Sequence, residues 1–349
     1  MHVRISRKPP SRLRPFRPHH PAHARRQRHQ PHPAREARYT VAVPSTRRCF
    51  LSHFAALPAL TSRHSPPAAP VVETHLHLFD PERFSYHPNA TYRPPAETLD
   101  DYARFAAQVG IDRAVIVHPE PYQDDHSYLE YCFRNEPSRG FFKGTCLFDP
   151  IAPGTPSRME ALVKKLPGRI VALRIHVNRD PKTPPTTSGA IRDRDLRAPA
   201  MNDAWRAAAR LGIAVQMHFI PPHAPQIRAL ASEFRDVTVI LDHLGKPGLG
   251  SPAEYAEVLA LASLPRVIMK YSAVHYSSKQ DYPHRDVKPF VRRAYDAFGP
   301  ERIIWGVLGS NLADFRKLSA LLDDMFDFAP ESARAAIRGL NAMRLFNFA

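Results

Sequence analysis

The feature that most constrains this chain is a regular alternation of apolar runs and helix-like segments after residue 70. Apolar, β-branched runs recur at about 71–79, 113–118, 141–148, 170–177, 213–220, 237–243, 266–273 and 302–308. The segments between them, such as MNDAWRAAARLG, place apolar residues three and four apart, as an amphipathic helix does. Apolar strands alternating with helices indicate a parallel sheet covered by helices, and this number of units predicts closure into a (β/α)8 barrel.

An open, doubly wound sheet is the alternative fold for such a pattern. That fold usually carries a Gly-x-Gly-x-x-Gly turn and gathers its polar strand ends at one switch point. The sequence lacks that turn, and polar residues follow many of its strands. The pattern therefore favours one α/β domain, a TIM barrel over residues 71–349, close to the ~250 residues that such a barrel takes.

Residues 1–70 differ in composition from the rest of the chain. They contain 14 Lys and Arg residues against a single acid, whereas the remainder of this +16 chain is nearly neutral. Residues 1–40 are rich in Arg, Pro and His without apolar periodicity, which predicts a disordered basic N-terminal extension. Arg47 and Arg48 precede a short apolar stretch within about residues 45–62, an order typical of a twin-arginine export signal. We expect export to the periplasm, or a cytoplasmic location if this segment is no signal.

The distribution of charge and hydropathy also bears on the partners. Because the positive charge is confined to the extension, the predicted barrel has no excess of basic residues, and nucleic-acid binding is not expected. No apolar run approaches the ~18 residues that a membrane-spanning helix needs. The partner that we expect is a small-molecule substrate.

Four histidines follow predicted strands, at the end of the barrel where such folds keep their active sites. They are His75 and His77 in VVETHLHLFD, His218 in IAVQMHFI and His243 in VTVILDHLGKP. Residues i and i+2 of a strand point to the same side, so the first two can face one ion. Neutral imidazoles with an open coordination position suit a catalytic zinc, which lowers the pKa of its bound water to roughly 7. The pattern predicts a metal-assisted hydrolase.

With THLHLFD, LDHLGKP, ERIIWG and LNAMRLFNF in this order, the chain resembles the amidohydrolase-related family, also called amidohydrolase 2, over about residues 71–348. The family includes lactonases and non-oxidative decarboxylases. In its metal-using members, two histidines of the first strand, the histidine of strand five and an aspartate of strand eight bind one divalent ion. The resemblance therefore implies His75, His77 and His218 as metal ligands, with His243 beside the bound water or substrate.

The strand-eight aspartate is absent from this sequence. The family usually reads Trp-Gly-Ser-Asp there, whereas this chain reads WGVLGSN at residues 305–311, which places Leu308 or Asn311 at the position of the acid. Glu73 lies two residues before His75, so we expect it to share the inward direction and to substitute as a ligand. The alternative is a glutamate deeper in the barrel, paired with a cation.

The predicted site also needs an acid–base group and cations for an anionic substrate. His243 is the expected proton shuttle, because an ordinary imidazole pKa of about 6.5 permits acid and base roles. Its neighbour Asp242 has the opposite strand parity and is expected to point outward. Arg174 and Lys270 at strand ends could hold an anionic group of the substrate, or serve as structural ion-pair partners.

Together with these residues, the resemblance implies hydrolysis of a small cyclic ester or related carbonyl compound by a lactonase-like enzyme. A non-oxidative decarboxylase is the first alternative, favoured by Glu73. A barrel that binds a ligand without catalysis is the second, because the strand-eight acid is missing.

Overall fold

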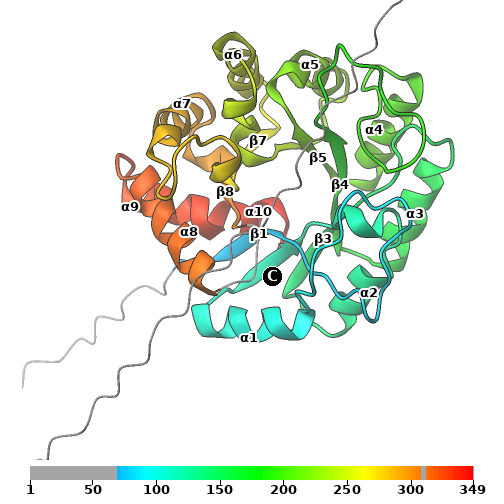
Figure 1. Cartoon of the computed structure of the whole chain (residues 1–349), viewed down its shortest axis with the longest axis horizontal. Coiled ribbons are helices and arrows are strands. Elements are labelled where there is room, and N and C mark those ends of the chain that lie inside the picture. Colours follow the sequence, from blue (N-terminus) through cyan, green and yellow to red (C-terminus); the bar gives the residue numbers. More distant parts are fainter. Residues whose placement is uncertain (1–68, 308–311, 349) are drawn as a thin grey trace, which may run out of the picture. The chain divides into compact units, whose positions relative to one another are not determined.

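The structure, a computed structural model, describes residues 69–307 and 312–348 and contains a parallel eight-stranded barrel. Strand pairing runs in sequence order from β1 to β8, and the helices form a ring outside the strands (Figure 1). The strands are β1 (Val72–Leu76), β2 (Arg113–Ile116), β3 (Phe142–Cys146), β4 (Ile170–Val177), β5 (Ala214–Phe219), β6 (Val239–Leu241), β7 (Val267–Tyr271) and β8 (Ile303–Trp305). Each lies within one of the predicted apolar runs, so the predicted TIM barrel is confirmed.

The helices follow the strands along the chain. They are α1 (Leu99–Val109), α2 (Ser127–Arg134), α3 (Thr155–Lys165), α4 (Pro199–Leu211), α5 (Ala224–Glu233), α6 (Pro252–Ala260), α7 (Lys288–Phe298), α8 (Leu312–Met325), α9 (Glu331–Ala335) and α10 (Asn341–Leu345). Helix α1 illustrates why these segments are helical. Thr98 and Asp101 form a capping box at its start, and Gly110 ends it in the left-handed conformation, with φ 74°.

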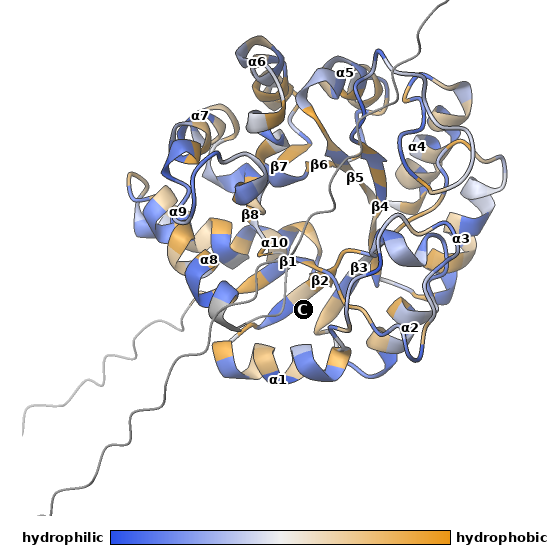
Figure 2. Ribbon diagram, viewed as in Figure 1, coloured by the Kyte–Doolittle hydropathy of each residue, from blue (hydrophilic) through white to orange (hydrophobic). Residues whose placement is uncertain are grey.

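The strands and the helices differ in hydropathy. The strands are mostly hydrophobic, whereas the helices carry both hydrophobic and hydrophilic residues (Figure 2). On α1 the buried side chains are Leu99, Tyr102, Phe105 and Ala106, which recur at helical spacing. Burial of these helix faces against the apolar sides of the strands makes the main hydrophobic core, which lies between the strands and the helices.

The inside of the barrel is filled in layers. A second apolar cluster contains inward residues of the strands, among them Val72, Ala172, Ala214, Ile240 and Ile304, together with side chains of the C-terminal segment. Two residues further along three of these strands, the inward side chains become polar. They are Arg174, Gln216 and Asp242. The interior thus changes from an apolar plug to a charged layer toward the C-terminal ends of the strands.

Side chains help to close the barrel between β8 and β1. The hydroxyl of Thr74 donates to the carbonyl of Trp305 at 2.6 Å. The carboxylate of Glu73 accepts the backbone N–H groups of His75 and of Val307, at 2.6 and 2.8 Å. Gly306 lies so close to β1 that a Cβ there would meet the His75 Cβ at 2.7 Å. The glycine is therefore needed for this close approach.

The predicted extension over residues 1–70, with its export signal, lies outside the described residues except for its last two positions. No helix in the described part of the chain combines the length and hydropathy needed to cross a bilayer.

Candidate functional site

A cavity of about 350 Å³ opens at the C-terminal ends of the strands. Its lining comes from strand ends and from the loops that follow them. The lining residues are His75, His77, Phe79, Tyr92, Pro94, Glu97, Glu120, Arg174, His176, Asn178, Arg192, His218, His243 and Tyr276. The structure thus brings the four predicted histidines and Arg174 together in one cavity, at the end of the barrel where the sequence placed them.

The imidazoles form a continuous row across this cavity. Ring centroids are 5.1 Å apart for His77 and His75, 4.6 Å for His75 and His243, and 5.1 Å for His243 and His218. His176 extends the row, 5.0 Å from His218. Burial lowers the pKa of His77 to about 3 and lowers the pKa values of the other four below their ordinary range. All five rings are therefore neutral at neutral pH.

Hydrogen bonds fix the orientation of two of these rings. His77 places Nδ1 2.7 Å from the carbonyl oxygen of Val117, which makes Nδ1 the protonated nitrogen. His243 places Nδ1 2.9 Å from the hydroxyl of Ser272. Each ring is thereby held by one nitrogen and keeps the other for the cavity.

Asp242 is the centre of the charged layer, and the expectation that it points outward is wrong. It is fully buried and accepts hydrogen bonds from Arg174 at 3.2 Å and from Gln216 at 3.0 Å. Lys270 and His75 lie 3.4 and 3.6 Å from it. Burial alone would raise the pKa of Asp242, but the neighbouring cations Lys270 and Arg174 hold it well below its usual value. Asp242 is thus an ionised carboxylate inside the barrel.

The expectation for Asp242 assumed that His243 continues strand β6 and points inward from it. The strand ends at Leu241, before both residues. The inward direction of Ile240 continues to Asp242, two residues later, as in any strand. His243 then adopts φ 57° and reaches the cavity from a turn instead of from the strand. A comparison with Ile240 would have identified Asp242 correctly.

Lys270 and Arg174 have different surroundings. The ammonium of Lys270 donates to the carbonyl of Thr74 at 2.9 Å and lies beside Asp242, and the side chain is outside the cavity lining. It has the environment of a structural ion-pair partner. Arg174 lines the cavity, and its Nε is buried without a hydrogen-bond partner. Of the two predicted anion-binding cations, only Arg174 faces the cavity.

Glu73 does not share the direction of His75. The pairing of β1 with β2 passes from Glu73 opposite Ala114 to Leu76 opposite Ile116, so β1 contains one extra residue there. Such a bulge shifts the side-chain alternation by one position. Burial raises the pKa of Glu73 to about 7, against the lowering effect of hydrogen bonds from the backbone. Its contacts are those of a residue that closes the barrel, and a ligand role stays a prediction.

The turn after β6 has an unusual backbone. His243, Leu244, Gly245 and Lys246 all have positive φ, between 52° and 68°. Left-handed conformations cost L-residues roughly 1–2 kcal/mol each. This strain, at the point where two polar side chains turn toward the cavity region, marks the turn as a functional element.

Sequence reasoning missed several residues that the loops contribute. Tyr92, Asn178, Arg192 and Tyr276 line the cavity, and Lys246 donates to the side chain of Asn178 at 2.6 Å. Burial lowers the pKa of Lys246 to about 7. Loop residues have no periodic signal, but Lys246 lies in the LDHLGKP motif and could have been considered.

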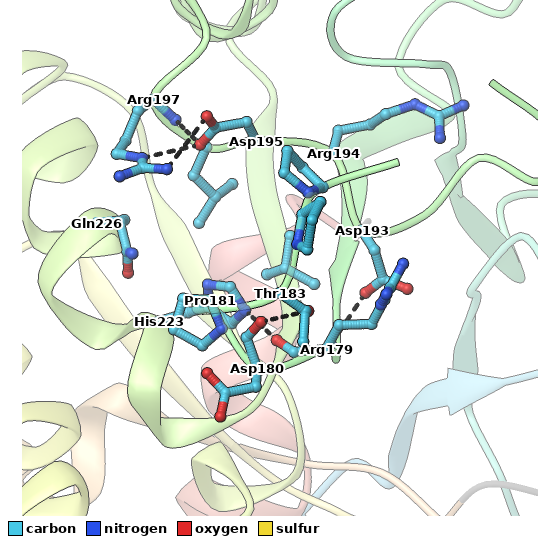
Figure 3. A pocket seen from close by; sticks show the side chains of 14 residues that line it. Arg179, Asp180, Pro181, Thr183, Asp193, Arg194, Asp195, Arg197, His223 and Gln226 are labelled. Carbon is cyan, nitrogen blue, oxygen red and sulfur yellow. Dashed lines mark hydrogen bonds and ion pairs between the residues drawn. The ribbon is translucent and has the colours of Figure 1, made fainter. Parts of the chain in front are cut away.

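A second cavity lies between the β4–α4 loop and the start of α5 (Figure 3). It is lined by residues that include Arg179, Asp193, His223 and Gln226, and its volume is about 30 Å³. That space accommodates about one water molecule. The cavity in the barrel mouth, at about 350 Å³, is the larger of these two and the one that contains the predicted histidines.

The described residues provide one group that could bind a metal ion by distance alone. Donor atoms of His75, Asp242 and His243 lie within 4.8 Å of one another. Asp242, however, already contacts Arg174 and Lys270, and the Arg174 guanidinium is 3.4 Å from His75 Nε2. Two like unit charges 4 Å apart repel by about 4 kcal/mol at an effective dielectric constant of 20. Since a divalent ion would lie beside two buried cations, these three residues do not suit a divalent ion. The zinc site predicted from the sequence uses other ligands and stays a prediction.

Among the described residues, His77 and His218 lie in the same row of rings but do not belong to the group whose donor atoms are within 4.8 Å of one another. Leu308 and Asn311, the candidates for the missing acid, lie outside the described residues. The ligand roles of His77 and His218 stay predictions. His218 Nε2 is buried without a partner, and it therefore has a nitrogen free for a ligand of some kind.

Comparison with known proteins identifies the family. A family model described as amidohydrolase matches residues 72–348. A 4-sulfomuconolactone hydrolase from Hydrogenophaga intermedia is 26% identical over 288 residues, which cover 78% of this chain and 88% of that protein. An L-fucono-1,5-lactonase from Burkholderia ambifaria is 27% identical over 282 residues, with coverage of 73% and 89%.

A solved structure shares the fold. An amidohydrolase from Burkholderia multivorans with bound zinc has 16% sequence identity and a TM-score of 0.63, and the match covers 80% of this chain and 100% of that one. At this identity the likeness shows the fold alone, whereas the family match extends over the whole barrel. The chain therefore belongs to the amidohydrolase family, as its motifs predicted, and is a hydrolase.

Proposed function

We propose that this protein hydrolyses a small lactone that carries an anionic group. The observation that supports this most directly is Arg174, a cavity-facing guanidinium whose Nε is buried without a partner beside neutral His243. A guanidinium can stabilise the negative charge that forms on a carbonyl oxygen during attack by water. The named relatives are lactone hydrolases, so ring opening is favoured over decarboxylation.

Hydrolysis of a lactone needs a base, a group that stabilises the negative charge on the carbonyl oxygen, and a proton donor. The oxygen of a water molecule attacks the lactone carbonyl carbon while His243 accepts a proton from that water through its cavity nitrogen. Arg174 hydrogen-bonds the carbonyl oxygen as it becomes negative. The ring C–O bond then breaks, and His243 returns the proton to the departing alkoxide oxygen. The products are a free hydroxyl and a carboxylic acid, which retains the second proton of the water and releases it to solvent at neutral pH.

Besides Arg174 at the carbonyl oxygen, the loops supply a second cation, which can bind the anionic group of the substrate. Arg192 is half-buried in the cavity lining and is held by Asp193 at 3.1 Å and by Thr91 at 3.2 Å. A guanidinium fixed in this way can bind a carboxylate or sulfonate with two parallel hydrogen bonds. We infer that Arg192 selects lactones that bear such a group.

Arg192→Met is expected to lower kcat/KM for a carboxylated lactone by roughly 10- to 100-fold, because a charged hydrogen-bond pair contributes about 1.5–3 kcal/mol. A neutral sugar lactone should be hydrolysed equally by both enzymes. Steady-state assays on matched lactones measure this difference. Arg197→Met, an exposed residue of the same loop, is the control. An equal loss on both substrates would contradict the selection of anions, and no turnover of any lactone would contradict the proposed function.

We propose that the steps above proceed without zinc, because Arg174 and Lys270 already supply positive charge at Asp242. The purified enzyme should then contain far less than one zinc per chain, and a chelator should leave its turnover unchanged. Elemental analysis and chelation assays measure both quantities. Stoichiometric zinc with loss of turnover after chelation would instead support the ligands expected from the sequence, His75, His77 and His218.

We also propose that residues 45–62 direct export by the twin-arginine route, on the basis of Arg47 and Arg48 alone. Replacing both arginines with lysine should retain the protein in the cytoplasm. Fractionation of cells that produce either form measures its location. An unchanged distribution would contradict the proposal.

A further inference from the structure

We propose that Lys246 and Asn178 set the tautomer of His218, so that this ring presents a protonated Nε2 to the carbonyl oxygen of the substrate. The proposal rests on the proposed function in one respect, because a lactone carbonyl is the group that this N–H would bind. The two positioning residues, Lys246 and Asn178, act through His218.

The direction of the Asn178 carboxamide follows from its contact with Lys246. In its ammonium form Lys246 has donors only, and its Nζ lies 2.6 Å from Asn178 Oδ1. The oxygen of the carboxamide must therefore face the lysine. The amide nitrogen then faces His218, with Nδ2 3.4 Å from Nδ1 of the ring. Since the amide nitrogen can only donate, Nδ1 must accept, and the proton of the neutral imidazole is on Nε2.

The backbone holds both positioning residues in place. The Asp193 carboxylate accepts the N–H groups of Asn178 and Arg179 at 2.7 and 3.1 Å, and the contact with Arg179 is visible in Figure 3. Lys246 has φ 52° and donates its N–H to the carbonyl of His243 at 2.9 Å. The left-handed turn after β6 thus places Lys246 within reach of Asn178.

The other nitrogen of His218 is available to a substrate. His218 lines the cavity, and its Nε2 is buried without a hydrogen-bond partner. A donor fixed in this way stabilises a developing oxyanion and is typically worth 10²–10³ in kcat. A protonated Nε2 has no lone pair for a metal ion. His218 is therefore a substrate contact and not a metal ligand while Asn178 keeps this orientation.

Asn178→Asp tests the chain of contacts from Lys246 through Asn178 to His218, with almost no change in side-chain shape. A carboxylate only accepts hydrogen bonds, so His218 must then donate from Nδ1 and leave Nε2 unprotonated. Nitrogen NMR of the full-length enzyme with ¹⁵N-labelled histidine, assigned with His218→Gln, reads the tautomer directly. We expect a protonated Nε2 in the wild type and a protonated Nδ1 in the variant. We also expect kcat to fall about 10²-fold, with a smaller change in KM.

Variants of Lys246 and a control at Asn135 separate the effect of these contacts on the tautomer from a general disturbance of the fold. Lys246→Met removes the donor that orients Asn178 and should give a mixture of tautomers, whereas Lys246→Arg keeps a donor and should restore the wild-type tautomer. Asn135→Asp, at the exposed end of α2, should change neither the tautomer nor kcat. A wild-type His218 protonated at Nδ1, or an unchanged tautomer in Asn178→Asp, would overturn the proposal. If no lactone is hydrolysed, the proposed function fails, but the tautomer can still be measured.

Discussion

Asp242→Asn should lower the free energy of unfolding by about 3–5 kcal/mol and abolish turnover, because it leaves buried cations without a counter-charge. Arg174 and Lys270 are at most 3% exposed, and both contact this carboxylate. Lys270 is fully buried, and Arg174 is only 3% exposed at the cavity, so neither can recover its full hydration. Arg174 would also lose the contact that fixes it beside the substrate, so activity should fall even in molecules that stay folded. Denaturant unfolding and lactone assays measure the two effects.

A matched exposed pair controls for the loss of a carboxylate. Asp203 contacts Arg206 at 2.7 Å on the surface of α4, and both side chains are more than half exposed. Asp203→Asn should change the free energy of unfolding by less than about 1 kcal/mol, because exposed ion pairs contribute little. If Asp242→Asn were as mild as this control, the charged layer would not stabilise the barrel as we describe.

His243→Gln should lower kcat by about 10²–10⁴-fold, the usual contribution of a positioned acid or base. The ring is buried in the cavity lining and is oriented by Ser272. Glutamine can hydrogen-bond that hydroxyl but cannot accept and return a proton at neutral pH. Substrate binding should remain, so KM should change much less than kcat. Steady-state kinetics and a thermal unfolding curve measure these quantities.

The control is a histidine outside the cavity. His284 lies in the loop before α7 and bonds the carbonyl of Gln280 through its ring. His284→Gln should leave kcat unchanged. A rise in KM for His243→Gln without a fall in kcat would show that His243 only binds the substrate, and the base would then have to be another group.

The barrel itself could be predicted from the sequence, because each strand is a local apolar run and each helix has a local period. The positions of His75, His77, His218 and His243 at strand ends followed from the same pattern. Arg174 was placed correctly on β4, since its inward parity is continuous with that of Ala172. Local alternation is sufficient where a strand is regular.

Prediction failed where the backbone departs from regular alternation. The bulge in β1 turns Glu73 away from the direction of His75, and the end of β6 separates Asp242 from His243. Neither irregularity has a signature in residue type. The missed loop residues, such as Arg192, lie in segments whose path depends on contacts such as the one with Asp193.

The sequence alone determined that this chain forms a barrel, which end of it contains the site and which family it resembles, because those properties depend on local periodicity and ordered motifs. Only the tertiary structure decided which charges meet. Arg174 and Asp242 are 68 residues apart and come from strands that are not neighbours, yet they face each other across the interior. Such contacts depend on the position of each side chain along the barrel axis. Strand register and bulges set that position. The structure therefore adds to the predicted histidines a buried charged layer, formed by Arg174, Asp242 and Lys270, that the sequence interpretation did not contain.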